Sequence, residues 1–186
     1  MDEDSSPAAI PPHDLPAEID LGRHRDFEGR LEAKWLRRGF LVVLLVFILA
    51  ALANAFGQAA ATDSASGAAG SLSVKAPSRV RGGLTYQAEF TIQAAAPLGA
   101  PTIVLDRGWV DQTTVNTVQP EPVGSTSDAE GNLKLRFAPM PPGRTLVVYV
   151  EFQANPINVG SHDADVSLYD GGHRVATIER TQLDFP

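Results

Sequence analysis

A single uncharged apolar stretch, from Gly39 to Gly57, constrains this chain more than any other feature of its sequence. At ~1.5 Å per residue, a helix of this length spans ~28 Å, close to the ~30 Å hydrocarbon core of a bilayer. We therefore expect a transmembrane helix over 39–57. Such a helix would place the segments before and after it on opposite sides of a membrane.

The charges that flank this stretch predict its orientation. Arg37 and Arg38 stand directly before it, whereas the first basic residue after it is Lys75. Because cytoplasmic flanks carry the excess of Lys and Arg, the N-terminus is expected in the cytoplasm and the C-terminal part outside, with the helix in the inner or plasma membrane. Trp35 has the position of an aromatic anchor at the membrane interface. Trp35, Arg37 and Arg38 are thus the expected topology determinants.

A cleaved export signal is the alternative. Ala53-Asn54-Ala55 has the A-x-A form of a signal-peptidase site, and Arg37-Arg38 followed by Phe40 and Leu41 has features of a twin-arginine signal. Signal peptides usually carry ~7–15 apolar residues after a short basic segment, and this run is longer and follows a long, partly acidic lead. The length of the apolar run and of the segment before it therefore favour a retained membrane anchor.

The regions around the expected span differ in composition. Residues 1–22 are acidic and contain four prolines, which predicts a disordered tail. In 23–38, large apolar residues recur every four positions, which predicts a juxtamembrane helix. Residues 58–70 are small and polar without apolar periodicity, which predicts a flexible linker. Ala51 and Ala55 form a small-xxx-small pair that leaves a homodimer open.

From residue 71 to 186 the hydrophobic period changes from helical to two, which is typical of half-buried strands. Turn-forming Gly, Pro, Asp and Asn clusters separate these strands, and no proline falls inside one. We predict an all-β domain of 7–8 strands folded as an antiparallel β-sandwich. The clearest strands are 72–75, 84–92, 133–137 and 146–152; weaker ones are 102–105, 113–118, 166–169 and 175–185, the last with a break in alternation at Ile178.

Composition excludes several classes of function. The chain has no cysteine, so disulfides and cysteine metal sites are absent, and its net charge of −7 without a basic cluster argues against binding to nucleic acid. The excess of Arg over Lys and the many Ala and Gly residues suggest a bacterial source. In architecture, the predicted domain resembles the immunoglobulin-like and fibronectin type III ectodomains of cell-surface proteins. The antibody-type Cys, Trp and Cys spacing is missing, so the resemblance implies no role for any residue.

The residues that could do chemistry are few. Ser161, His162 and Asp163 are the right types for a nucleophilic triad, but adjacent residues do not normally reach that geometry. Asp163, Asp165 and Asp170, and separately Asp128, Glu130 and Asn132, give only partial sets of calcium ligands. We expect no catalytic residue, metal or cofactor, and hence no enzyme.

Two connections are candidates for recognition. The first begins near Trp109, which is either an exposed binding anchor or part of the core. The second, 155–163, carries Asn155, Asn158 and His162 after the strongest predicted strand. We therefore expect an interaction domain, either an accessory subunit of a membrane assembly or a receptor, with the bilayer and a membrane or envelope protein as partners. The alternatives are a cleaved, exported carbohydrate- or cell-wall-binding module and, third, an envelope enzyme.

Overall fold

The computed structural model describes residues 31–53, 57–111, 113–157 and 159–186. The predicted tail over 1–22, the first part of the predicted helix over 23–38, and Asn158 lie outside the described residues. The chain divides into two compact units between Ile48 and Leu49.

The first unit is built on the helix α1 (Leu31–Leu52). Lys34–Leu52 has the length and composition of a membrane span, with a mean hydropathy of 2.2, and none of it is buried against other parts of the protein. The expected juxtamembrane helix and the expected span are one continuous helix in the described residues. The helix ends at Leu52 rather than at Gly57, and 54–56 lie outside the described part.

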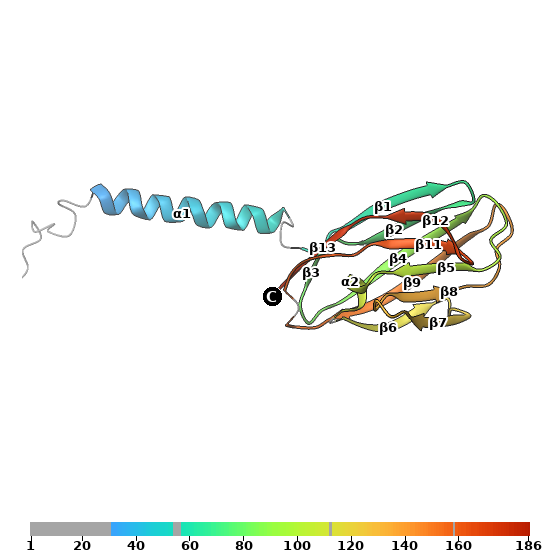
Figure 1. The fold of residues 1–186 in the computed structure, drawn as a ribbon. Helices are drawn as coiled ribbons and strands as arrows, with labels where there is room; N and C mark the ends of the chain where they lie inside the picture. The colour runs from blue at the N-terminus through green and yellow to red at the C-terminus, as the bar shows by residue number, and fades with distance from the viewer. Residues whose placement is uncertain (1–30, 54–56, 112, 158) are drawn as a thin grey trace, which may run out of the picture. The chain divides into compact units, whose positions relative to one another are not determined.

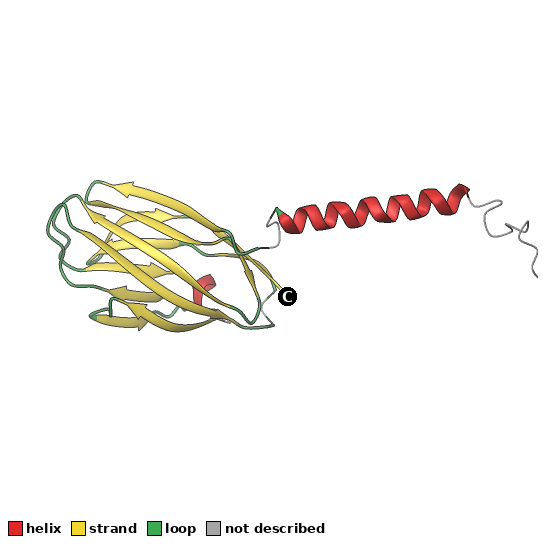
Figure 2. Cartoon of the chain, turned by 180° about the vertical axis from the view of Figure 1, so that it is seen from behind, coloured by secondary structure: helices red, strands yellow, loops and turns green. Residues whose placement is uncertain are grey.

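The second unit is a β-sandwich of two five-stranded sheets with a small third sheet at one end (Figures 1 and 2). All neighbouring strands are antiparallel except β13 and β3, which are parallel. The first sheet has the order β1 (Ala60–Gly67), β2 (Gly70–Pro77), β4 (Thr85–Ala94), β9 (Thr145–Ala154), β6 (Thr113–Gln119). The second has the order β12 (His173–Ile178), β11 (Val166–Asp170), β5 (Pro101–Leu105), β8 (Leu133–Arg136), β7 (Gly124–Ser127), and the small sheet β10 (Gly160–Asp163), β13 (Thr181–Phe185), β3 (Arg79–Arg81).

The β-sandwich prediction is confirmed, but the count of 7–8 strands is wrong, since the described residues form thirteen. The interpretation of 58–70 as a flexible linker is also wrong, because β1 pairs with β2 along its whole length, from Ala60 opposite Pro77 to Gly67 opposite Gly70. Its Ala, Thr and Ser side chains show no apolar alternation, and backbone pairing at a sheet edge does not need one. The strands β3, β7 and β10 were missed because they are short or polar.

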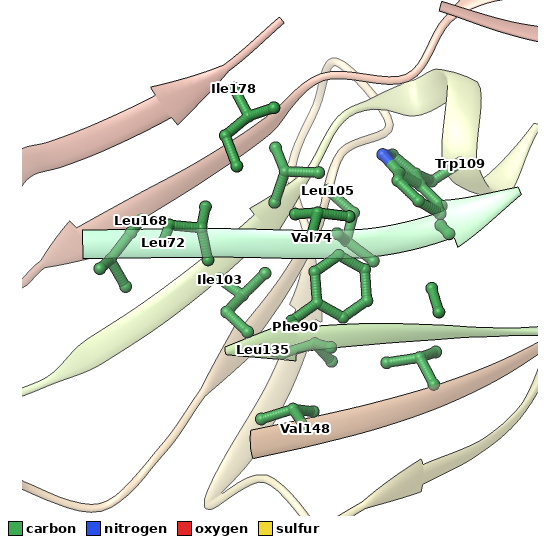
Figure 3. Packing of buried hydrophobic residues seen from close by; sticks show 14 of the residues in the cluster. Leu72, Val74, Phe90, Ile103, Leu105, Trp109, Leu135, Val148, Leu168 and Ile178 are labelled. Carbon is green, nitrogen blue, oxygen red and sulfur yellow. The ribbon is translucent and has the colours of Figure 1, made fainter. Parts of the chain in front are cut away.

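Inward-facing residues of the two large sheets form one hydrophobic core (Figure 3). The best-defined predicted strands supply Phe90, Leu135, Val148 and Phe152, all fully buried, as expected from their alternation. Leu84 is 48% exposed, which corrects its assignment to a buried strand face. It lies in the turn before β4 begins at Thr85.

The two ends of the sandwich differ in what they carry. We call proximal the end at which β1 begins at Ala60. At this end β2 ends and β4 begins. The C-terminus also lies here, because the Gly82 amide, just before β4, donates to the Phe185 carbonyl at 2.8 Å. The opposite, distal end holds the β1–β2 turn and the connections around residues 95–100, 120–123, 138–144 and 171–172.

Candidate functional site

Trp109 belongs to the core, so the hypothesis that it is an exposed binding anchor is wrong. It sits on the short helix α2 (Arg107–Val110) and is 1% exposed. Its ring lies 5.5 Å from that of Phe90 (Figure 3). It also lies 5.3 Å from the ring of Phe152, and its Nε1 donates to the Ala164 carbonyl at 2.8 Å. The alternative prediction, that Trp109 is part of the core, is confirmed.

A charged side chain covers this tryptophan. The guanidinium carbon of Arg180 lies 5.0 Å from the ring centre, and the same group donates to the carbonyls of Ala76 and Pro77 at 3.3 and 3.2 Å. Asp63 on β1 lies 3.6 Å from its Nε. Burial lowers the pKa of Arg180, and the negative charge of Asp63 acts in the opposite direction. These contacts join β1 and β2 to the start of β13, which is a structural role.

His162 also belongs to a polar cluster on the inner side of the small sheet, in which Gln182 and Asp184 are buried and His162 is partly exposed. Its Nε2 lies 3.8 Å from Asp184, and Gln182 donates to Asp184 at 3.0 Å and lies 3.5 Å from the Tyr86 hydroxyl. Burial raises the pKa of Tyr86 to about 12. His162 therefore lies on the same side of the small sheet as Gln182 and Asp184, with 24% of its side chain exposed.

The structure does not bring the sequence-predicted binding residues together. Asn155 accepts a hydrogen bond from the Ile157 amide at 3.2 Å in the β9–β10 loop, an Asx-type turn, while Trp109 and His162 are turned inward from other elements. Asn158 lies outside the described residues. Along β10, Ser161 and Asp163 face outward and His162 inward, so strand alternation separates the three triad-type residues.

Acidic residues from the predicted partial sets of calcium ligands accept hydrogen bonds from backbone amides instead. The Asp170 carboxylate accepts from the Ala100 amide at 2.7 Å, and that of Asp165 accepts from the Arg180 amide at 3.0 Å. In the part of the chain that the structure describes, no group of three or more His, Asp or Glu side chains could hold a metal ion.

An apolar groove at the distal end is the first candidate site. It has a volume of about 450 Å³ and lies between the β6–β7 connection and the β8–β9 connection. Met140 is anchored there by paired backbone hydrogen bonds with Leu98 at 2.8 and 2.9 Å, and Val123 at the rim is 65% exposed. The groove is lined by Pro120, Glu121, Val123, Phe137, Ala138, Pro139, Met140, Pro141, Arg144, Thr145 and Leu146.

Sequence reasoning missed this groove because it treated the prolines only as turn markers. The segment Ala138–Pro141 joins apolar side chains to prolines that cannot donate backbone hydrogen bonds, and this mixture was the available signal. A proline-rich turn exposes apolar rings that neighbouring strands do not cover. Two such segments flank the β7–β8 hairpin, in which Gly124 lies opposite Arg136, and this pairing brings them together as a groove.

A smaller polar hollow of about 310 Å³ lies on the outer face of the second large sheet. Asp128 accepts from the Asn132 amide at 2.9 Å and pairs with Lys134 at 3.2 Å. Desolvation tends to raise the pKa of Asp128, but the hydrogen bonds from Asn132 and Lys134 outweigh it and lower that pKa to about 2. The lining residues are Thr102, Val104, Asp128, Asn132, Lys134, Tyr169, Gly171 and Gly172.

Comparison with known proteins gives similarities of fold. No protein-family profile matches the chain, and no curated protein matches it. Among solved structures, a non-cellulosomal cohesin from Archaeoglobus fulgidus is 20% identical, with a TM-score of 0.41 over 58% of this chain and 86% of that one. The cohesin CaCohA2 from Clostridium acetobutylicum is 17% identical, with a TM-score of 0.36 over 53% and 74%.

A third solved structure is AvmM, which catalyses macrocyclization in alchivemycin A biosynthesis. It is 10% identical, with a TM-score of 0.33 over 70% of this chain and 92% of that one. An enzyme and cohesins thus appear together at low identity. These scores are too low to indicate a partner or a reaction for this chain.

Proposed function

We propose that this chain is a single-pass membrane protein whose extracytoplasmic β-sandwich is an interaction domain that binds a protein partner in its distal groove. The observation that carries the proposal is the groove itself. Its volume of about 450 Å³ falls within the ~300–1,000 Å³ typical of ligand sites. Because its lining is mostly apolar, it fits an apolar side chain or short segment of a partner.

The charges of the groove support binding rather than catalysis. Glu121 and Arg144 are the two ionisable groups in its lining, beside prolines and apolar residues. An acid and a permanent cation can orient a partner's polar groups, but neither forms a nucleophile and base pair of the kind that covalent catalysis needs. We accordingly propose an accessory subunit or receptor.

The membrane part of the proposal rests on α1. Lys34–Leu52 has the length and hydropathy of a span, and none of that window is buried inside the protein. Arg37 and Arg38 near its start favour a cytoplasmic N-terminus. The expected result is resistance to alkaline extraction, with external protease removing the sandwich from intact spheroplasts. Soluble chain that begins after Ala55 would instead indicate cleavage and export.

Site-specific photocrosslinking tests the groove. A photoreactive residue at Val123 should capture one defined membrane or envelope protein in intact cells. The matched position is Thr126, which is exposed on the neighbouring β7 but does not line the groove. Val123→Asp should weaken that capture from a probe elsewhere in the groove, and Thr126→Asp should not. The same adducts from both probe positions would refute a specific groove partner.

A second candidate function, carbohydrate or cell-wall binding, is favoured by the polar hollow. Tyr169 offers an aromatic ring beside Asp128, Asn132 and Lys134, a combination of stacking surface and hydrogen-bonding groups that suits a sugar. Tyr169→Ala should then abolish retention of the protein on cell-wall glycans. Tyr149→Ala is the control, since Tyr149 is 40% exposed on a strand of the other large sheet. Equal retention of both variants would eliminate this candidate.

A further inference from the structure

The strand β13 carries its side chains in the reverse of the usual arrangement. Its polar residues Gln182 and Asp184 point inward and are 2% and 1% exposed. Its apolar residues point outward, with Leu183 42% exposed and Phe185 half-buried. A strand covering a core normally places polar residues towards water, so the outer face of this small sheet is suited to a less polar environment.

More apolar residues surround this outer face at the proximal end. Leu84 is 48% exposed, Ile157 76% and Val159 59%. The β9–β10 loop that carries the last two is held against the turn before β4, because a side chain at Gly82 would lie 3.0 Å from the Pro156 carbonyl oxygen. We call these three residues the apolar rim. Their grouping at one end distinguishes them from singly scattered surface apolar residues.

The same outer face is basic. In the parallel pairing of β13 with β3, Leu183 lies beside Arg79 and Phe185 beside Arg81. Arg79 and Arg81 are exposed, while Val80 between them is fully buried, so both arginines are on the outward side. The acidic outward residue of this sheet, Asp163, pairs with Thr181 at the opposite end of β13 from Phe185. Cations therefore alternate with apolar groups at the proximal end.

The short connection between α1 and β1 bears on which partner could cover this surface. Residues 53–59 join Leu52, the end of α1, to Ala60, the start of β1. A fully extended segment of that length reaches at most about 25–30 Å. If α1 spans a membrane, as proposed above, the proximal end is thus covalently confined near the bilayer surface. Basic residues with apolar neighbours are the combination that binds an anionic lipid surface.

We propose that the proximal end docks on the anionic surface of the bilayer, with the apolar rim in the headgroup region and Arg81 against lipid phosphates. This inference rests on the membrane span of the proposed function. Docking by this end leaves the distal groove, at the other end of the sandwich, directed away from the lipid and open to a partner. The domain would then have one lipid-binding end and one protein-binding end.

Fluorescence quenching on the full chain tests this proposal, and the absence of cysteine allows single labelling sites. Ile157→Cys and, as the distal control, Gly172→Cys are labelled with an environment-sensitive dye. Gly172 is exposed in the β11–β12 turn, and a side chain there meets no atom within 4 Å. Each protein is reconstituted into vesicles of phosphatidylcholine alone or of phosphatidylcholine with phosphatidylglycerol. Both vesicle types contain lipids with nitroxide-labelled headgroups.

The dye at Ile157 should be blue-shifted and quenched in the vesicles with phosphatidylglycerol, and the dye at Gly172 should remain as in water. Arg81→Glu should reduce the quenching at Ile157. Arg174→Glu, the same change at an exposed position of β12, should leave it unchanged. The melting temperatures of both charge variants establish that the sandwich is folded.

Two failures are distinguishable. A chain that resists alkaline extraction but leaves the Ile157 dye unquenched, or quenched equally without phosphatidylglycerol, overturns the lipid docking and leaves the span intact. A chain released by alkaline extraction, with both dyes in water, overturns the span and this inference together. Quenching that Arg81→Glu and Arg174→Glu reduce equally would also refute a role for Arg81.

Discussion

Replacement of Trp109 by alanine should destabilise the sandwich by about 3–5 kcal/mol, the usual cost of removing a large aromatic side chain from a core. The ring is 1% exposed and contacts Phe90 and Phe152, so little solvent can fill the space it leaves. The change also removes the ring beneath the Arg180 guanidinium. Since small domains are stable by roughly 5–15 kcal/mol, this loss could exceed half of the total.

Trp109→Phe separates the hydrogen bond from the packing. It retains an aromatic ring but leaves the buried Ala164 carbonyl without the indole donor at 2.8 Å. An unsatisfied buried acceptor costs about 1–3 kcal/mol, so this variant should lie between the wild-type chain and Trp109→Ala. The order of the three free energies of unfolding is the test of the geometry.

Urea unfolding of the full chain in detergent micelles, followed by circular dichroism in the β region, gives these free energies. Trp35→Ala is the matched control, because Trp35 is 69% exposed on α1, outside the sandwich unit. Its unfolding midpoint should equal that of the wild-type chain. An unchanged midpoint for Trp109→Ala would refute the core assignment, and with it the packing argument for α2.

Two further predictions concern charged groups. Asp63→Asn removes the carboxylate that lies 3.6 Å from the buried Arg180 guanidinium and should cost about 1–2 kcal/mol in urea unfolding. This is less than the ~3–5 kcal/mol of a fully buried pair because Asp63 is partly exposed. Asp111→Asn, which breaks the exposed pair with Arg107, should cost at most about 0.5 kcal/mol, and equal losses for the two variants would refute the difference in burial. The pKa of Asp128 is lowered to about 2 from an unfolded value of about 3.9, so its contribution to stability is present above about pH 4 and is lost as pH falls towards 2. Asp128→Asn should therefore flatten the dependence of the melting temperature on pH between about pH 4 and 2. A dependence equal to that of the wild-type chain would contradict the hydrogen bonds assigned to this carboxylate.

The sequence predicted those parts of the fold in which side-chain burial decides the structure. Phe90, Val148 and Phe152 alternate with polar residues because one face of each strand meets the core, and period-two patterns report that directly. The edge strand β1 could not be found in this way. It is held by backbone hydrogen bonds to β2, and small side chains at an edge leave no periodic trace.

The candidate sites were less predictable because they depend on which segments meet. The distal groove needs the 120–123 and 137–141 segments side by side, and the β7–β8 hairpin that pairs them contains the short polar strand β7, which has no apolar alternation. His162 lies in a segment that is polar in sequence, but it pairs with Gln182 across the sheet and lies 3.8 Å from Asp184, so it faces inward. A single sequence identifies residue types, whereas their direction follows from pairing across the fold.

The reversed face of β13 shows how one such pairing reaches from stability to surface chemistry. A slip of β13 by one position would bury Leu183 and expose Asp184, which the hydrophobic effect alone would favour. Arg180 opposes that slip: its amide donates to Asp165 at 3.0 Å, and its guanidinium donates to the Ala76 and Pro77 carbonyls while lying over the Trp109 ring. Residues 180, 182 and 184 share one side of a strand, so fixing Arg180 inward also turns the two polar residues of β13 inward and its apolar residues outward. The outward apolar face is therefore a consequence of how the core is closed, and a lipid surface next to that face would shield from water the apolar area that this register exposes.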